Sequence, residues 1–436
     1  MIDIKHFDPS ETVRGIQQLL VSDKKKIAFL FGAGTSMARR HDSAPYVPAI
    51  TKMTEIIEAK VTKNKVYKIV LDEIKSEFIA TSITFNIETL LSNIEDKTKI
   101  IGSGKLNQID KSGFEDFISM IKNEIRDIVS IHKKFKEDDA RLLVQYDFAK
   151  WIKNADRKYA VEILTTNYDY LFEIGLEEVG VPYYDGFTGS YMPFFNPASL
   201  EDMAYLPQQT KLWKIHGSLG LRDIKTTSIH KIVRHRALGP DAEDLLIYPS
   251  TLKYSNSQKM PYAAFMDRLN DFLKQDDAVL FACGYSFADE HINERILSAL
   301  NTNSTSHVFA FYYDIVGSGE LKKYTLTEDC KLAQIALNNR KVSVLGTRNA
   351  IIGSVYGKWK LKREPDKNDT LNVQWYFDED APINTSIDIK VEQQGNEVWT
   401  GEGELVLPDF VRFVSFLKNM IPKNEWEEDG VGKIPN

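Results

Sequence analysis

The chain has 436 residues, of which 43% are hydrophobic and 27% are charged, and its formal net charge is -7. This length allows two or three domains, and the composition is that of a globular protein with enough apolar residues for a core. An acidic chain has no general electrostatic attraction to nucleic acid or to an anionic membrane. We therefore expect no direct nucleic-acid binding.

The N-terminal residues, the apolar stretches and the cysteines predict the cellular compartment of the protein. Residues 1–15 are polar and lack the apolar core of a signal peptide. No stretch approaches the roughly 18 to 20 apolar residues that span a bilayer. The two cysteines, Cys283 and Cys330, cannot form a disulfide framework or a four-cysteine zinc site. We expect a cytoplasmic protein without a membrane segment and without a bound metal.

Short apolar runs along the chain predict the buried strands of a parallel sheet. The first run, Lys26–Phe31, stops at a glycine turn, and amphipathic helices are predicted between several later runs. Strands that alternate with helices predict an α/β fold with a doubly wound parallel sheet. The other predicted strands are 161–165, 212–215, 245–248, 278–283, 307–312 and 341–345, and the predicted helices are 168–179, 262–273 and 290–300.

One long segment interrupts this alternation. Between about residues 50 and 156 the pattern is helical, most clearly in residues 114–129, where apolar residues recur three and four apart. No strand is predicted there. We interpret this segment as a helical insertion between the first two strands of the sheet.

The pattern changes again after residue 353. Apolar and polar residues alternate, which predicts half-buried antiparallel strands. A final helix with an apolar stripe is suited to covering one face of a sheet. We predict a catalytic domain of residues 1–353 and a small α+β docking or oligomerisation domain of residues 354–436. Its predicted elements are strands 358–363, 371–378, 386–392 and 398–407, a turn at 394–396 and a helix at 410–420, before a loose tail.

The glycine turn at Gly32–Ser36 is the first candidate binding site. Glycines between a strand and a helix let backbone amides approach a phosphate closely. The turn is neither a GxGxxG motif, since Met37 stands at the sixth position, nor a P-loop. Taken alone, it predicts a nucleotide turn no more strongly than a tight turn needed for packing.

Two later strands end in polar residues that can do chemistry. The strand at 161–165 runs into Thr166, Asn167 and Asp169, and the strand at 212–215 runs into His216. Ligands bind at the carboxyl ends of strands in open α/β sheets, so these side chains are expected at the binding edge. The alternatives are that Asn167 or Asp169 caps the following helix, and that His216 is a structural histidine.

A third segment of this kind follows the strand at 278–283. Gly284 and Ser286 suit contact with a ribose or a phosphate. Asp289 is expected to cap the helix that follows, and both roles are compatible with one loop.

Together these segments resemble the sirtuin-like family, in particular the sirtuin-like NAD hydrolases of bacterial anti-phage defence. The matching segments occur in the family's order over about residues 26–350, and the ordered set is specific although the glycine turn alone is not. They are GAGTS at 32–36, Pro48, NIETLLSNIE at 86–95, TTNYD at 165–169, KIHGSL at 214–219 and GYSFADEHIN at 284–293.

The resemblance implies that NAD is the substrate. It implies that Asn167 positions the nicotinamide-side ribose and a water, that Asp169 is associated with the nicotinamide carboxamide, and that His216 is the general base. Gly284 and Ser286 match the segment near the adenosine ribose. The glycine turn would hold the phosphates. Together with the two later loops, this gives as the implied binding residues Gly32, Ala33, Gly34, Thr35, Ser36, Thr166, Gly284 and Ser286.

Two departures separate the chain from sirtuins that deacylate proteins. The chain cannot build their four-cysteine zinc module, and their Gly-Ile-Pro-Asp-Phe-Arg segment is absent after the glycine turn. Residues 39–41 (RRH) and 44–48 (APYVP) stand there instead. Both departures favour NAD hydrolysis over acyl-lysine chemistry, and the helical insertion fits the defence-associated branch.

The expected reaction is therefore cleavage of the nicotinamide–ribose bond by water, through an oxocarbenium-like state. The role given to His216 requires a neutral imidazole, which predicts loss of activity in acid. The alternatives are a protein deacylase or ADP-ribosyltransferase that uses the same pocket, and a non-catalytic subunit that senses NAD or ADP-ribose. We expect a homo-oligomer that rests inactive, with a HerA-type ATPase as the favoured partner.

Overall fold

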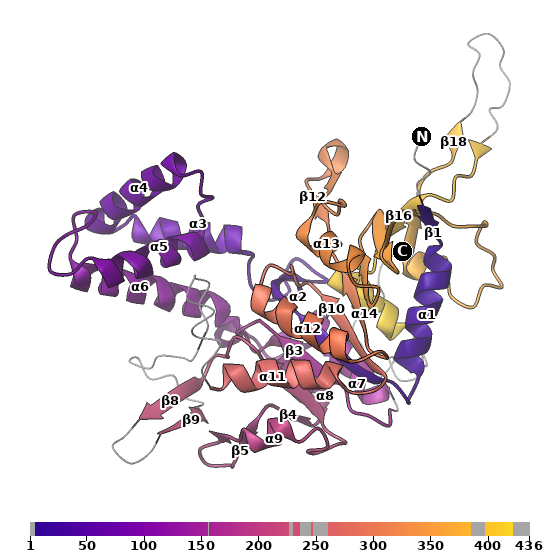
Figure 1. Cartoon of the computed structure of the whole chain (residues 1–436), viewed down its shortest axis with the longest axis horizontal. Helices are drawn as coiled ribbons and strands as arrows, with labels where there is room; N and C mark the ends of the chain where they lie inside the picture. The colour runs from indigo at the N-terminus through magenta and orange to yellow at the C-terminus, as the bar shows by residue number, and fades with distance from the viewer. Residues whose placement is uncertain are drawn as a thin grey trace, which may run out of the picture.

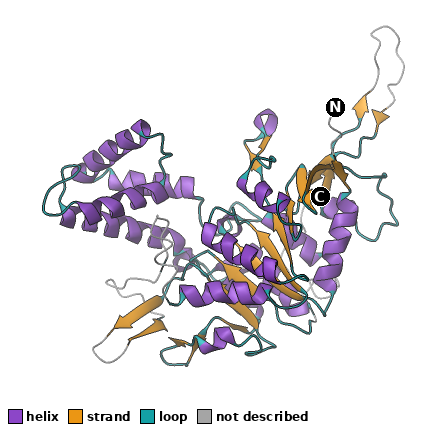
Figure 2. Cartoon of the chain, in the orientation of Figure 1, coloured by secondary structure: helices purple, strands orange, loops and turns teal. Residues whose placement is uncertain are grey.

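The computed structural model describes residues 5–155, 157–225, 230–235, 246, 260–384 and 397–421. Within these residues a ten-stranded sheet forms the centre of the protein, and helices cover both of its faces (Figure 1 and Figure 2). The order across the sheet is β1 (Lys5–Phe7), β16 (Val355–Trp359), β15 (Asn349–Ile352), β14 (Val342–Leu345), β11 (His307–Phe311), β10 (Ala278–Cys283), β2 (Lys26–Phe31), β3 (Glu162–Thr165), β7 (Thr210–Lys214) and β4 (Tyr183–Tyr184). Strand β15 runs antiparallel to β14 and β16, and the other neighbours are parallel.

Smaller sheets and the helices complete the described fold. The smaller sheets are β5 (Phe187–Thr188), β6 (Phe194–Phe195), β9 (His230–Arg234) and β8 (Leu221–Lys225); β12 (Ile315–Val316) with β13 (Lys323–Tyr324); β17 (Phe377–Glu379) with β20 (Gly403–Leu405); and β18 (Ile383–Asn384) with β19 (Glu397–Val398). The α-helices are α1 (Pro9–Val21), α2 (Ala33–Met37), α3 (Ile50–Val61), α4 (Lys65–Ala80), α5 (Ile87–Ile100), α6 (Lys111–Val129), α7 (Val144–Asn154), α8 (Leu171–Val179), α9 (Ala198–Glu201), α11 (Tyr262–Leu273), α12 (Glu290–Thr302), α13 (Lys331–Leu337) and α14 (Phe410–Lys418). Short 3-10 turns span Ile131–Lys134, Asp139–Leu142, Gly319–Leu321 and Val373–Trp375.

Strand β2 shows why the sheet is covered on both faces. Its side chains alternate, so Phe29 and Phe31 pack among α1, α7, α8 and α14, whereas Ala28 and Leu30 pack among α11, α12 and α13. All four side chains are fully buried. A continuous apolar run is what a parallel strand buried on both faces requires. The predicted doubly wound α/β fold is confirmed.

The order of the strands creates a ligand-binding edge beside β2. The chain passes from β2 to β3 on one side, and it returns later to place β10 on the other side. The register aligns Phe31 with Thr165 and with Cys283, and it aligns Thr165 with Lys214. The segments that follow β2, β3, β7 and β10 therefore begin at the same edge of the sheet. Such a topological switch point is where open α/β sheets bind their ligands.

The residues between β2 and β3 are helical, as predicted. Helices α3 to α6 extend away from the sheet as an arm (Figure 1), and they pack around a core of their own that includes Phe114 and Phe117. Helix α7, by contrast, packs beside α8 on the central sheet. The arm reaches the sheet through Leu219, which belongs to the core of the arm and follows β7.

The segment after residue 353 packs against the central sheet. Its first strand, β16, pairs with β15 and with the N-terminal strand β1. The ring centroid of Phe410 in α14 lies 5.3 Å from that of Phe31, and the centroid of Phe413 lies 4.7 Å from that of Phe311. The predicted helix therefore covers a sheet face, and that face belongs to the central sheet. The division into domains at residues 353 and 354 stays a prediction.

Two predicted strands of the C-terminal segment are shorter than their alternation suggested. In residues 371–378 the side chain of Asn372 accepts a hydrogen bond from Gln374 N at 3.0 Å, which starts a 3-10 turn before β17. In residues 398–407 the chain turns at Gly401, whose φ is +69°. Local side-chain and glycine turns thus override a period-two pattern.

Other predicted elements cannot be compared. The predicted strand at 386–392, the turn at 394–396 and the tail from 424 onward lie outside the described residues. The same holds for the predicted strand at 245–248, except for Leu246, which forms an isolated β-bridge with Gly217.

Candidate functional site

The glycine turn between β2 and α2 packs directly against the loop that follows β10. The amide of Gly34 donates to Gly284 O at 2.9 Å. A Cβ atom on Gly34 would lie 2.7 Å from Gly284 Cα, and a Cβ atom on Gly32 would lie 2.5 Å from Gly284 O. Gly284 itself has a φ of +63°. Glycine is therefore required at all three positions for the two loops to approach this closely.

This packing limits which amides of the turn can face a ligand. The amide of Gly34 is bonded to Gly284, and the amide of Thr35 donates to Gly32 O at 3.0 Å. Ala33 is exposed and begins α2, and no side chain caps the helix at Gly32. The expected phosphate contacts of Gly32–Ser36 remain a prediction, with Ala33 the residue of the turn that is most open to solvent.

Asn167 connects the turn to the loop that follows β3. Its Nδ2 donates to Gly32 O at 3.0 Å, to Thr35 Oγ1 at 3.1 Å and to Ser36 Oγ at 2.7 Å. The residue is only 7% exposed. Helix α8 begins after Tyr170 and has no side-chain cap hydrogen bond, so Asn167 does not cap this helix. It fixes the position of the turn instead.

Asp169 makes a second connection to the same turn. Its Oδ2 accepts a hydrogen bond from Ser36 Oγ at 2.6 Å, and its Oδ1 accepts from Leu171 N at 3.1 Å. The N-cap residue of α8 is Tyr170, so Asp169 is not the predicted cap, although its Oδ1 bonds the first amide of the helix. The other oxygen faces the glycine turn.

A buried ion pair supports this loop from below. Lys214 Nζ donates to the backbone oxygen of Asp169 and lies 3.2 Å from Glu173 Oε1. The side chains of Lys214 and Glu173 are 3% and 6% exposed. Burial raises the pKa of Glu173, and the nearby charge of Lys214 opposes that shift.

His216 follows β7 and faces the loop that follows β10. Its Nε2 lies 3.2 Å from Asp289 Oδ2, and the two side chains are 10% and 9% exposed. Gly217, the next residue, has a φ of +87°, which turns the chain back sharply after the strand. The histidine is therefore held at the ligand-binding edge and is paired with a carboxylate.

The remaining predicted residues occupy the same edge. Thr166 N donates to Phe31 O at 3.1 Å, which continues the pairing of β2 and β3 into the loop. Ser286 is exposed, and its Oγ accepts from Ala288 N at 3.4 Å. Direct contacts thus join the glycine turn to Asn167, Asp169 and Gly284, and His216 contacts the β10 loop through Asp289.

Gln145 and Lys214 contact the loops of this site but were not among the residues predicted from the sequence. Gln145 in α7 is 1% exposed, and its Nε2 donates to Thr35 O at 2.7 Å. No pattern near residue 145 indicates this contact. Lys214 had a usable signal, because a lysine inside a strand that is buried on both faces needs a buried acid as its partner.

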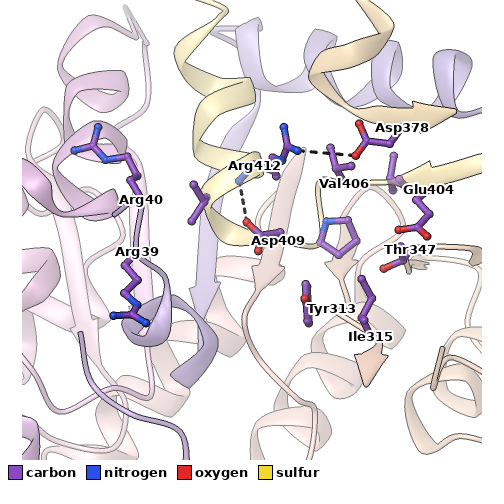
Figure 3. A pocket seen from close by; sticks show the side chains of 13 residues that line it. Arg39, Arg40, Tyr313, Ile315, Thr347, Asp378, Glu404, Val406, Asp409 and Arg412 are labelled. Carbon is purple, nitrogen blue, oxygen red and sulfur yellow. Dashed lines mark hydrogen bonds and ion pairs between the residues drawn. The ribbon is translucent and has the colours of Figure 1, made fainter. Parts of the chain in front are cut away.

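A cavity of about 390 Å³ lies at the same edge of the sheet, beyond β10 (Figure 3). Tyr313 and Ile315 after β11 and Thr347 after β14 line it on one side. Arg39 and Arg40, which follow α2, Asp378 in β17 and residues of the C-terminal segment 404–412 line the rest. The catalytic candidates do not line this cavity.

Part of the chain matches a known protein family. Residues 161–333 match the family model described as SIR2-like domain, whereas a comparison with curated proteins gave no match. The matched range begins at β3 and ends in α13, so it contains Asn167, His216 and Gly284 but not the glycine turn. The match supports a sirtuin-like family and an NAD-related function.

Two further findings concern the described part of the chain alone. None of its helices is long and apolar enough to cross a membrane. No group of three or more His, Cys, Asp or Glu side chains is placed there to hold a metal ion.

The close approach of the two loops predicts the effect of a single methyl group. Gly34→Ala would place Cβ 2.7 Å from Gly284 Cα, so the loops must separate. We expect a loss of about 1–3 kcal/mol in the free energy of unfolding and weaker NAD binding, measured by denaturant titration and by calorimetry. Gly15→Ala is the matched control, because nothing lies within 4 Å of its Cβ in helix α1. Equal behaviour of the two variants would contradict the packing argument.

The buried ion pair predicts a pH-dependent destabilisation. Lys214→Met leaves the buried Glu173 without its ion-pair partner, and only the charge of Arg234 remains to favour the carboxylate, so we expect a loss of about 3–5 kcal/mol near pH 8. Without the charge of Lys214 to oppose the effect of burial, the pKa of Glu173 is higher in the variant than in the wild type. Stability is therefore retained at low pH, where the carboxyl is protonated, and is lost as pH rises through the folded-state pKa. The unfolding free energy of the variant relative to the wild type, measured at pH 5 and pH 8, should show the smaller loss at pH 5.

The control for this experiment is a partly exposed pair. Lys25 contacts Asp277, and their side chains are 32% and 51% exposed. Lys25→Met should cost no more than about 1 kcal/mol at either pH. A Lys214→Met loss that is small, or that does not change with pH, would show that the Glu173 charge is not held by Lys214.

Proposed function

We propose that the protein hydrolyses NAD at the nicotinamide–ribose bond and releases nicotinamide and ADP-ribose. The observation that supports this most is the contact of Asn167 with the glycine turn at the switch point of the sheet, within hydrogen-bond distance at three acceptors. The His216–Asp289 pair lies at the same edge. The match of residues 161–333 to a SIR2-like domain supports NAD as the ligand.

The proposed chemistry needs only the residues at this edge. A water attacks the anomeric carbon of the nicotinamide ribose, and the bond to the pyridinium nitrogen breaks. Nicotinamide leaves with the electron pair of that bond, which neutralises its positive charge. The water supplies the new hydroxyl group, and His216 accepts its proton. The Nδ2 of Asn167 is engaged with the glycine turn, so its Oδ1 is the atom that orients the water or a ribose hydroxyl.

The cavity of Figure 3 is the proposed place for the adenosine half of the substrate. Strand β11 lies two strands from β2, which is about 10 Å across the sheet. Tyr313 offers an aromatic face there, and Arg39 and Arg40 also line the cavity, although each is paired with a carboxylate, Asp42 and Asp147 respectively. The C-terminal segment then forms one wall of the substrate site.

The biological role is a further step of the proposal. Free NAD hydrolysis would harm the cell that makes the enzyme, so we propose a cytoplasmic effector of anti-phage defence that rests inactive. The arm of α3 to α6 exposes large apolar side chains, including Ile79 at 81% and Ile100 at 76%. Exposed apolar side chains of this kind suit contact with another protein. We propose this arm for homo-oligomer contacts or for a HerA-type ATPase partner.

Loss of the proposed base should stop the reaction without unfolding the protein. We expect His216→Ala to lower the rate of NAD consumption by about 100-fold or more, with little change in the thermal midpoint. The measurement is the amount of nicotinamide and of free ADP-ribose formed from NAD, for the protein alone and with candidate partners. Asn167→Ala should have a similar effect on rate, and it should also loosen the glycine turn.

His6→Ala is the control, because His6 is an exposed residue of the edge strand β1. A normal rate for His216→Ala would remove His216 from the mechanism. ADP-ribose attached to protein, in place of free ADP-ribose, would indicate a transferase. NAD binding without any turnover, with every partner present, would indicate a sensing subunit.

A further inference from the structure

Asp289 caps a helix with one carboxylate oxygen and contacts His216 with the other. It precedes helix α12, and its Oδ1 accepts hydrogen bonds from His291 N at 3.1 Å and from Ile292 N at 3.3 Å. One oxygen is therefore enough to cap the helix. The second oxygen, Oδ2, lies 3.2 Å from His216 Nε2.

Asp289 is fixed at both its side chain and its backbone. The two helix amides fix Oδ1, and the buried Tyr285 donates its hydroxyl to the backbone oxygen of Asp289 at 3.4 Å. The start of α12 also favours a negative charge at this position, because the helix dipole is positive there. Oδ2 is thus a preformed acceptor that faces the imidazole.

Other helix caps of this chain do not share the arrangement. Asp110 caps α6 by accepting from Gly113 N, and Asp409 caps α14 by accepting from Arg412 N. The described residues pair neither of them with a histidine. The contact of Asp289 with His216 is therefore not a general consequence of helix capping.

We propose that Asp289 is a positioning residue for His216. It holds the hydrogen of the neutral imidazole on Nε2 and leaves the lone pair of Nδ1 to accept a proton from the attacking water. It also stabilises the imidazolium that forms. This inference rests on the proposed NAD hydrolysis, in which His216 is the base, and Asp289 itself touches neither the substrate nor the water.

Asp289→Asn tests the proposal because asparagine still caps a helix well. Its amide group would direct a donor at Nε2 and favour the other tautomer. We expect kcat for NAD hydrolysis to fall about 100-fold or more, while KM and the Kd for NAD stay within about threefold. The thermal midpoint should stay near that of the wild type. A purely structural cap would instead change stability and binding.

A direct readout of the tautomer separates this inference from the proposed function. The protein is labelled with ¹⁵N-histidine, and the His216 signals are assigned by their absence in His216→Ala. In the wild type, at a pH where the imidazole is neutral, they should report hydrogen on Nε2. In Asp289→Asn the balance should move toward Nδ1.

Asp110→Asn is the matched control, since it makes the same chemical change at the cap of α6 and should leave kcat and the tautomer unchanged. Unchanged kcat and tautomer in Asp289→Asn would overturn the proposal, as would a loss of kcat explained by lost folding or NAD binding. If the wild type consumed no NAD with every candidate partner present, the proposed function would fail, and the tautomer measurement would still decide whether Asp289 positions His216.

Discussion

The contact of the glycine turn with its two neighbouring loops is the constraint on which the site depends. Asn167 Nδ2 bonds three acceptors of the turn, and Gly34 N bonds Gly284 O. These bonds join the segments that follow three adjacent strands. A side chain on either glycine would keep these segments apart. This packing fixes the backbones of the loops before a ligand binds. The side chains of the catalytic candidates are therefore already in position when the ligand arrives. A preorganised edge of this kind is also costly to disturb, since its polar groups are buried.

The rest of the protein supports this edge from several directions. The buried pair of Lys214 and Glu173 holds the loop of Asp169, and Gln145 holds the turn from helix α7. Helix α14 covers the strands beneath the turn through Phe410. Parts of the chain that look like additions, namely the end of the insertion and the C-terminal segment, therefore contribute to the floor and one wall of the proposed site.

The sequence predicts the inner strands from β14 to β7 because most of their residues are apolar, whereas it misses the outer strands β1, β4 and β15. The glycines and polar strand ends locate the edge where the loops meet. Sequence-based prediction fails where one polar side chain decides between two local structures, as Asn372 does when it converts part of a predicted strand into a turn. It also fails for partners that are distant in the chain, such as Gln145 with Thr35, because no periodicity records them. Asp289 shows both limits: its spacing identifies a helix cap, but only the fold brings His216 to its second oxygen.

The most direct test of the central claim is the structure of His216→Ala with NAD bound. We expect the pyrophosphate beside the turn at Gly32–Ser36, the nicotinamide ribose between Asn167 and the truncated residue 216, and the adenosine toward Tyr313. A dinucleotide bound with its nicotinamide ribose away from Asn167, or at another edge of the sheet, would contradict the account.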